Sequence, residues 1–141
     1  MCRCLCREHE CEPPGPVWLQ FEQAFDRAHC VANPGKFAGY GESCWGLTAS
    51  YDPWGYSAHA PDTDNGTITP TGALASLPYA PAEVVTVLRH FLKRYGKRLW
   101  GEFGFVNAFC ESQNWYADRF LAIDQGPIIV MNTKRRPITH C

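Results

Sequence analysis

The sequence predicts an all-α fold whose function lies in long irregular loops between the helices. Several segments of the 141-residue chain place apolar side chains at three- and four-residue intervals, the spacing of an amphipathic helix. Proline, glycine and capping residues bound these segments. No alternation of strands and helices and no repeat of fixed period is visible, so we expect helix pairs. The length suits one domain, with about four or five helices.

Two helices are expected in the first half of the chain. Residues 17–33 form the first, and the turn sequence Asn33-Pro34-Gly35 ends it. Its apolar face carries Trp18, Phe21, Phe25 and Ala28. A shorter helix should run through residues 73–76, because Thr69 can cap it, Pro70 suits its first position and Pro78 stops it.

The clearest helix follows these two. Pro81 occupies its first turn, Glu83 lies at its positive end, and Gly96 ends it. One face of this helix carries Val84, Leu88, Phe91, Leu92 and Tyr95. The basic run at residues 89–98 leaves that face apolar, so we interpret these charges as a solvated helix face and not as a nucleic-acid contact.

Two further helices are expected towards the end of the chain. Ser112 can cap one of them, which would carry Trp115, Phe120 and Leu121. Gly126 and Pro127 should start the other, which continues through residues 128–131.

The ends of the chain differ from the central domain at residues 17–132. Residues 1–16 form a leader rich in Cys and Pro, expected to be disordered, and residues 133–141 form a divergent tail. The leader holds Cys2, Cys4, Cys6 and Cys11, whose spacing could also bind a metal ion as an interaction tail, although it is not a usual zinc pattern. The other cysteines considered are expected to be small buried hydrophobes: Cys30, Cys44 and Cys110.

Composition and missing motifs exclude several classes of binding partner. The net charge of −1 gives no general attraction to nucleic acid or acidic membranes, so a neutral partner fits better. The sequence has no run long enough to span a membrane, and residues 1–11 lack the apolar core of a signal peptide. Nucleotide-binding, serine-hydrolase and zinc-protease motifs are missing, so no cofactor and no metal are expected in the domain.

The segment at residues 39–70 is an unusually long irregular stretch for a folded domain, and such loops are commonly functional. Aromatic rings and acids share the loops, a combination that suits the flat faces and hydroxyls of sugars. The rings are Tyr40, Trp45, Trp54, Tyr56 and Trp115. The acids are Glu42, Asp52, Asp62, Asp64, Glu111, Asp118 and Asp124. Hydrolysis of a glycosidic bond needs two carboxyl groups, one as acid and one as base or nucleophile.

Several of these acids also have structural explanations. Asp124 could cap the helix that follows it, and a carboxylate there would have its ionised form favoured, as a base requires. Glu111 and Asn114 bracket the start of a predicted helix, so capping competes with catalysis. Glu42, between Gly39 and Gly41 on one side and Trp45 on the other, is less easily explained as structural.

The acids of the following loop are open to three interpretations. Asp62 and Asp64 precede Asn65-Gly66, which indicates a turn, with a sugar contact or a bound cation as alternatives. His59 is either a hydrogen-bonding core residue or a partner for a sugar hydroxyl.

Residues 40–84 and 99–131 closely resemble the C-terminal region of the bacterial putative-glucoamylase family, which includes endo-β-1,2-glucanases. The resemblance spans roughly residues 21–131, with several motifs in the same order. It implies part of an (α/α)6 barrel, a loop cleft for β-glucan, and hydrolysis that inverts the anomeric centre. It also implies a full-length protein in the periplasm or outside the cell.

Four motifs carry the resemblance. Residues 40–46 match the family's Y-G-E-N-C-W-G through Tyr40, Glu42 and Trp45, with Ser43 in place of Asn. The next loop matches through Tyr56, His59, Asp64 and Gly66. Glu111, Asn114 and Trp115 match T-E-N-W with a shifted acid, since the family's Glu aligns with Gln113. Asp124 and Gln125 match I-D-Q-G-P.

The resemblance therefore implies catalytic roles for Asp124, Glu42 and Glu111, with Asp124 and Glu42 the preferred pair. Substrate binding is implied for a second set, namely Tyr40, Trp45, Trp54, Tyr56, His59, Asp64, Asn114, Trp115 and Gln125. The chain would be a fragment of a β-glucan hydrolase. The alternative is a non-catalytic carbohydrate-binding fragment that lacks the complete carboxylate pair.

The chain is short for a complete barrel of this type, which needs about a dozen helices. A partial barrel would leave an apolar flank uncovered, which favours self-association.

Overall fold

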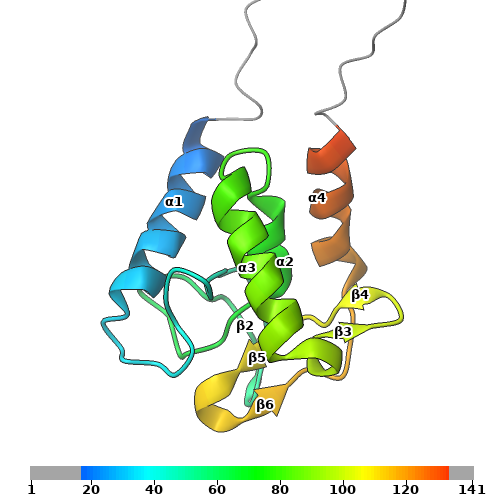
Figure 1. Cartoon of the computed structure of the whole chain (residues 1–141). Helices are drawn as coiled ribbons and strands as arrows, with labels where there is room; N and C mark the ends of the chain where they lie inside the picture. Colours follow the sequence, from blue (N-terminus) through cyan, green and yellow to red (C-terminus); the bar gives the residue numbers. More distant parts are fainter. Residues whose placement is uncertain (1–16, 134–141) are drawn as a thin grey trace, which may run out of the picture.

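The computed structural model describes residues 17–133, in which helices pack side by side above a group of short hairpins (Figure 1). The helices are α1 (Val17–Ala32), α2 (Pro70–Ala75), α3 (Pro81–Arg94) and α4 (Ala122–Thr133). Two 3₁₀ turns, Gly96–Arg98 and Glu111–Gln113, lie between α3 and α4. The predicted leader and tail fall largely outside the described residues, so the cysteine-rich metal tail does too.

The first three helices confirm the sequence predictions. α1 ends at Ala32, one residue before Asn33, whose positive φ of 46° leaves the helical region. α2 and α3 each begin at a proline, as expected. Thr69 occupies the cap position of α2, but its side chain makes no capping bond, and its hydroxyl donates to Ser50 Oγ instead.

The predictions for the last two helices need correction. The α-helix expected to start at Ser112 does not form: the 3₁₀ turn Glu111–Gln113 is followed by Asn114, which has a left-handed φ of 48°, and the chain then enters a strand. The strand pairs back onto Phe109 and Cys110, so ladder bonds replace the expected helical bonds. α4 begins at Ala122, earlier than predicted, and holds Pro127 inside it.

Three two-stranded antiparallel hairpins make the all-α prediction wrong in part. β1 (Ser50–Asp52) pairs with β2 (Gly55–Ser57), with Tyr51 opposite Tyr56. β3 (Trp100–Gly101) pairs with β4 (Gly104–Phe105), and β5 (Phe109–Cys110) with β6 (Trp115–Tyr116). Strands of two or three residues are too short to produce a readable period-two pattern.

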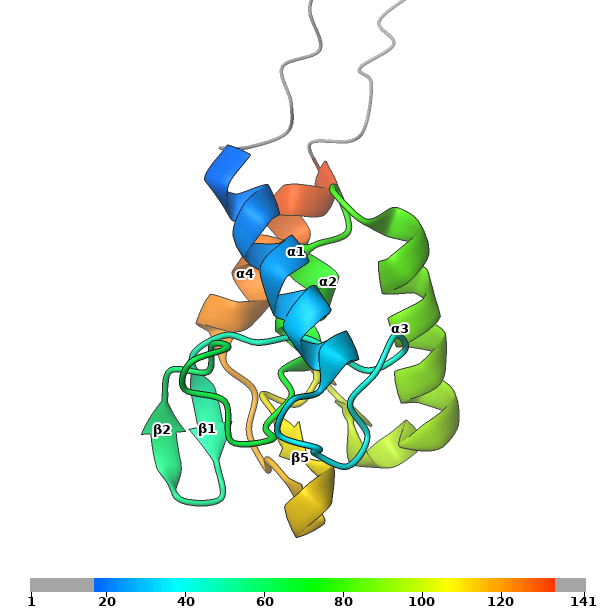
Figure 2. The same ribbon diagram turned by 90° about the vertical axis from the view of Figure 1, so that its left-hand side faces the viewer.

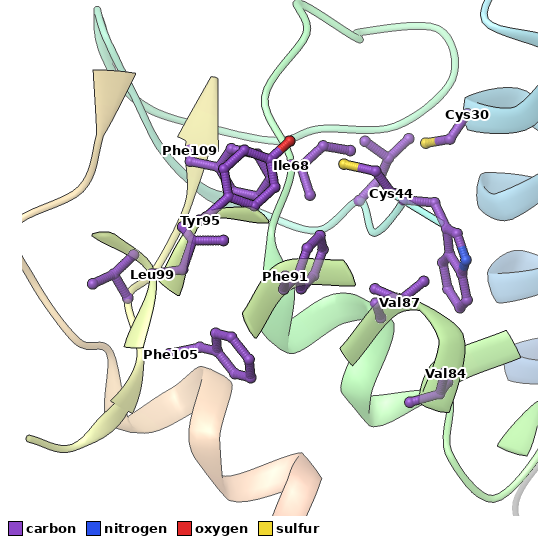
Figure 3. Close-up of a cluster of buried hydrophobic side chains, with 14 of the residues drawn as sticks. Cys30, Cys44, Ile68, Val84, Val87, Phe91, Tyr95, Leu99, Phe105 and Phe109 are labelled. Carbon is purple, nitrogen blue, oxygen red and sulfur yellow. The ribbon is translucent and has the colours of Figure 1, made fainter. Parts of the chain in front are cut away.

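The core lies between α3 and the hairpins (Figure 3). Val84, Val87 and Phe91 project from α3 towards Ile68, Leu99, Phe105 and Phe109, all of them buried. Phe91 meets Phe109 edge to face, with ring centroids 5.6 Å apart. Full burial of each such side chain contributes about 1.5–3 kcal/mol. This cluster holds α3 against Ile68 and the hairpins.

The cysteines confirm the prediction of buried thiols. Cys30, Cys44 and Cys110 are free and buried. Burial raises the pKa of Cys30 and that of Cys44 to about 12, so both remain thiols at neutral pH.

The long segment at residues 39–70 is folded against the core. Gly41 and Cys44 exchange backbone hydrogen bonds, and the Gly46 carbonyl accepts from Thr69 N–H. Gly46 has a φ of 138°, and a Cβ there would lie 2.5 Å from the Thr69 carbonyl oxygen, so glycine permits this close approach. Ile68 exchanges two further backbone bonds with Phe109. The segment is thus bonded to itself and to β5.

No helix within residues 17–133 is long and apolar enough to cross a membrane.

Candidate functional site

A hollow of about 1050 Å³ opens between α1, α2, the start of α4 and the segment from Leu47 to Asp62. Figure 2 shows α1, α2 and α4 together above the β1–β2 hairpin. Polar and acidic side chains on its lining include Glu22, Asp26, His59, Asp62 and Asp124. Its apolar lining includes Phe25, Tyr56, Tyr79, Ile123 and Pro127. Rings beside carboxylates suit a ligand with both flat apolar faces and hydroxyl groups.

The structure brings three of the predicted site residues to this hollow: Tyr56, His59 and Asp124. Tyr56 lies on β2, and its ring stands edge to face on Tyr51 at 5.1 Å. The ring is about half exposed and so is available to a ligand. Asp62, an acid from the same loop, also lines the hollow.

Asp124 lies in the first turn of α4, inside the helix and not at its cap. Burial raises the pKa of its carboxyl, and a hydrogen bond from the Asn107 amide only partly opposes this. The expectation that the helix start would favour the ionised form is therefore wrong, because desolvation is the larger effect. A partly buried carboxyl at a hollow is a typical acid–base group.

His59 forms part of the buried wall of the hollow. Burial lowers its pKa, which favours the neutral ring, although Asp52 lies close, with Nε2 3.8 Å from Asp52 Oδ2. Neither ring nitrogen has a partner that meets hydrogen-bond geometry among the described residues. A neutral imidazole can both donate to and accept from a ligand hydroxyl.

Asp52 organises the loop around His59. Its carboxylate accepts hydrogen bonds from the backbone N–H groups of Trp54 and Gly55, from the Ser57 hydroxyl and from the Asn65 amide. Although burial alone would raise it, these donors hold the pKa of Asp52 below its usual range. Asp52 is therefore a structural anchor for the β1–β2 hairpin.

Two acids of the hollow, Glu22 and Asp26, were not identified from the sequence. They lie one turn apart on α1. Burial, together with the charge of Glu22, raises the pKa of Asp26 to about 6, and His29 opposes the rise. The four-residue spacing was readable, but which face of α1 borders the hollow depends on its packing.

Glu111 does not line the hollow, and the catalytic role that the resemblance implies for it stays a prediction. Tyr95 donates a 2.6 Å hydrogen bond to Glu111 Oε2, and Arg94 pairs with Oε1. Burial would raise the pKa of Glu111, but the bonds from Tyr95 and Arg94 and the Arg94 charge lower it. These contacts join the end of α3 to the turn after β5.

Glu42 and Trp45 also lie outside the lining of the hollow. Glu42 is exposed. Trp45 belongs to the buried core and is only 2% exposed, so the sugar-stacking role predicted for it is not available to its ring. The tight turn between Gly41 and Cys44 directs the chain into the core at this point.

Tyr40 and Asp64 form a structural contact. The Tyr40 hydroxyl donates to Asp64 Oδ1 at 2.6 Å, and His29 Nε2 lies 2.9 Å from Oδ2. Asp64 Oδ1 also accepts from Gly66 N–H, which confirms the predicted turn. These bonds link the end of α1 to the long segment.

The other predicted binding residues are dispersed. Trp54 is exposed at the tip of the β1–β2 hairpin, and Asn114 is exposed after its 3₁₀ turn. Gln125 donates to the Phe105 carbonyl. Trp115 lines a smaller hollow of about 330 Å³, together with Tyr51, Asp52 and Arg119.

Within the described part of the chain, no three His, Cys, Asp or Glu side chains are grouped closely enough to hold a metal ion.

Comparison with known proteins gives consistent matches. The family model described as "Putative glucoamylase" matches residues 20–136. An exo β-1,2-glucooligosaccharide sophorohydrolase of Parabacteroides distasonis is 46% identical over 108 residues, which cover 75% of this chain and 15% of the relative.

Two solved structures are similar in fold and sequence. A putative glucoamylase from Bacteroides uniformis has a TM-score of 0.77 at 54% identity. An endo-β-1,2-glucanase from Chitinophaga pinensis, in complex with sophorotriose and glucose, has a TM-score of 0.77 at 45% identity. Each match covers 79% of this chain and 27% of the solved chain. The chain thus spans a minor part of the length of its relatives.

Proposed function

The chain belongs to the family described as "Putative glucoamylase", and on this premise we propose that it is part of a glycoside hydrolase acting on β-1,2-linked glucan. One observation carries the proposal: Tyr56, His59 and Asp124 line a single hollow. Two relatives named for β-1,2-glucan chemistry share 45–46% identity with the chain. The proposed ligand is a β-glucan or its oligosaccharides, with no cofactor.

We propose that the described helices form part of an (α/α)6 barrel. The TM-score of 0.77 to two solved relatives supports a shared arrangement of these elements. The relatives contain further chain that could supply the remaining helices, since the match covers 27% of their length.

The proposed chemistry is inverting hydrolysis, with Asp124 as the base that activates water. Its carboxylate reaches the hollow and accepts a hydrogen bond from Asn107. An inverting enzyme also needs a protonated carboxyl about 6.5–9.5 Å from the base. Asp26 is the proposed acid, because it lines the hollow and burial raises its pKa to about 6.

The second candidate function is carbohydrate binding without turnover. The positions of Glu42 and Glu111 favour it, because both acids lie away from the hollow. A chain that spans 15–27% of its relatives can also lack one member of the carboxylate pair. In that case the aromatic and hydroxyl-binding groups would remain, and hydrolysis would be lost.

Linear β-1,2-glucan distinguishes the two functions. The purified chain is incubated with the glucan, and new reducing ends and binding heats are measured, with a β-1,3-glucan as the linkage control. Reducing ends that depend on Asp124 support hydrolysis. Binding without reducing ends supports the second function, and neither signal would overturn both.

We also propose that the chain self-associates through an uncovered flank of α1 and α4. Phe25, Ile123 and Ile129 are large apolar side chains on these helices that are more than half exposed. Large apolar side chains that are exposed can be covered by a second chain. For the full-length protein we propose action in the periplasm or outside the cell, on the family resemblance alone.

A further inference from the structure

Asn107 is a fully buried amide that lies between two functional elements of the fold. It occupies the chain between β4 and β5, and its side chain is inaccessible to solvent. Tyr51 N–H donates to Asn107 Oδ1 at 2.7 Å, and Asn107 Nδ2 donates to Asp124 Oδ2. The residue thus connects the β1–β2 hairpin, which carries Tyr56, with the start of α4.

The hydrogen-bond network fixes the orientation of this amide. A backbone N–H can only donate, so the Asn107 atom facing Tyr51 must be the oxygen. The NH₂ group therefore faces Asp124, and it can only donate. The backbone N–H of Asn107 donates to the Arg119 carbonyl at 2.9 Å, which holds the residue in place independently of its side chain.

We propose that Asn107 is a positioning residue for Asp124, whose carboxylate it holds as a hydrogen-bond acceptor at the wall of the hollow. A carboxyl group that faces a fixed donor is stabilised in its ionised form. The bond from Asn107 opposes the effect of burial on the Asp124 pKa, and so favours the ionised carboxylate that a base requires. The catalytic role of Asp124 in this inference rests on the proposed function. The hydrogen bond between Asn107 and Asp124 does not depend on it.

Other charged groups also face the hollow and must be separated from this effect. They are Glu22 and Asp26 from α1, and Asp62 and the titratable His59 from the long segment. α2 contributes uncharged Thr71, Gly72 and Ala75. Among the described residues, Asn107 alone donates a hydrogen bond to the side-chain carboxylate of Asp124. A substitution of Asn107 should therefore alter the pKa of Asp124 without altering that of Asp26.

The wild-type chain provides the first test, by NMR. The side-chain ¹⁵N signal of Asn107 and the carboxyl ¹³C signal of Asp124 are followed between acidic and neutral pH in the 141-residue protein. The proposal predicts that both signals change with one common midpoint. An Asn107 signal that is insensitive to the Asp124 titration would overturn the proposal.

Variants provide the second test. Asn107→Ala removes the donor and should raise the measured pKa of Asp124 by about one unit or more. Asn107→Asp keeps the acceptor for Tyr51 N–H but places two carboxyls together, so the pair should show an apparent pKa that is raised further. Asn65→Ala is the matched control, because Asn65 donates to Asp52. Asn65→Ala should alter the pKa of Asp52 and leave the pKa of Asp124 unchanged.

Folding of each variant is checked by its backbone amide spectrum. If folded Asn107→Asp leaves the Asp124 titration at its wild-type midpoint, the proposal is overturned. Isothermal titration with sophorotriose is run on the same samples. A shifted Asp124 pKa in a chain that binds no sugar would retain the positioning role and count against the proposed function. Sugar binding by a variant whose Asp124 pKa is unchanged would support the proposed function and overturn the positioning role of Asn107.

Discussion

The Tyr95 hydroxyl donates a 2.6 Å hydrogen bond to Glu111 Oε2, which joins the end of α3 to the turn that follows β5. The carboxylate also contacts Arg94, and a Cβ at Gly39 would lie 2.2 Å from Oε2. The Glu111 carboxylate is thus surrounded by Tyr95, Arg94 and Gly39, and it does not line the hollow.

Glu111→Gln should therefore lower stability and leave sugar binding unchanged. Loss of the charged acceptor should lower the free energy of unfolding by about 1–3 kcal/mol. Urea unfolding measures the loss, and titration with β-1,2-gluco-oligosaccharide measures binding. Tyr95→Phe, which removes only the donor, should cost about 1 kcal/mol. A large loss of sugar affinity in either folded variant would contradict the structural role.

Asp26→Asn should stabilise the chain at neutral pH. The folded pKa of about 6 lies above the unfolded value of 3.8, so the acid's contribution to stability is fully present below the unfolded pKa and is lost as pH rises through 6. Removing the charge should raise the free energy of unfolding by about 1–2 kcal/mol at pH 7, allowing for solvent screening.

This gain should disappear near pH 4, where the wild-type side chain is protonated in the folded protein. Urea unfolding at both pH values measures the difference, with exposed Asp118→Asn as the control. Equal effects of Asp26→Asn at pH 4 and pH 7 would contradict the raised pKa.

Tyr56→Ala should weaken sugar binding, because the ring borders the hollow and is half exposed. Loss of one aromatic contact is expected to reduce affinity about two- to tenfold. Trp54→Ala is a matched control, since Trp54 is an exposed aromatic on the same hairpin but does not line the hollow. If Trp54→Ala reduces affinity more than Tyr56→Ala, the hollow is not the sugar site.

Ile129→Glu should reduce self-association, because it places a charge on the exposed flank of α4 and Ile129 does not line the hollow. Light scattering coupled to size exclusion gives the mass of the assembly at each concentration. Leu92→Glu is the control, since Leu92 is an exposed apolar residue on α3. A wild-type chain that remains monomeric at all soluble concentrations would refute the proposed flank.

The long helices could be predicted because their signals are local. α3 has a proline start, an acid in the first turn and an apolar face that ends near Gly96, all within one segment. The hairpins could not be predicted, since each strand is defined by its partner. Tyr51 and Tyr56 pair across a turn, and Phe109 pairs with Tyr116 across a left-handed Asn114.

Part of the site could be predicted, because some of its residues stand in local sequence patterns. Tyr56, His59 and Asp124 were identified as aromatic, titratable and acidic groups in loop sequences. Asn107 and Asp26 were missed, because one acts through a contact 17 residues away and the other through the packing of α1. The motif around Trp45 predicts a sugar-binding ring, but it gives no indication of how deeply the ring is buried.

The central claim is that the hollow between α1, α2 and α4 binds a β-1,2-linked glucan, and NMR titration of the labelled chain with sophorotriose tests it most directly. We predict saturable shifts at Tyr56, His59, Ala75 and Asp124, with no change at Glu111. The absence of saturable shifts, or shifts centred on Glu42 and Glu111, would contradict it.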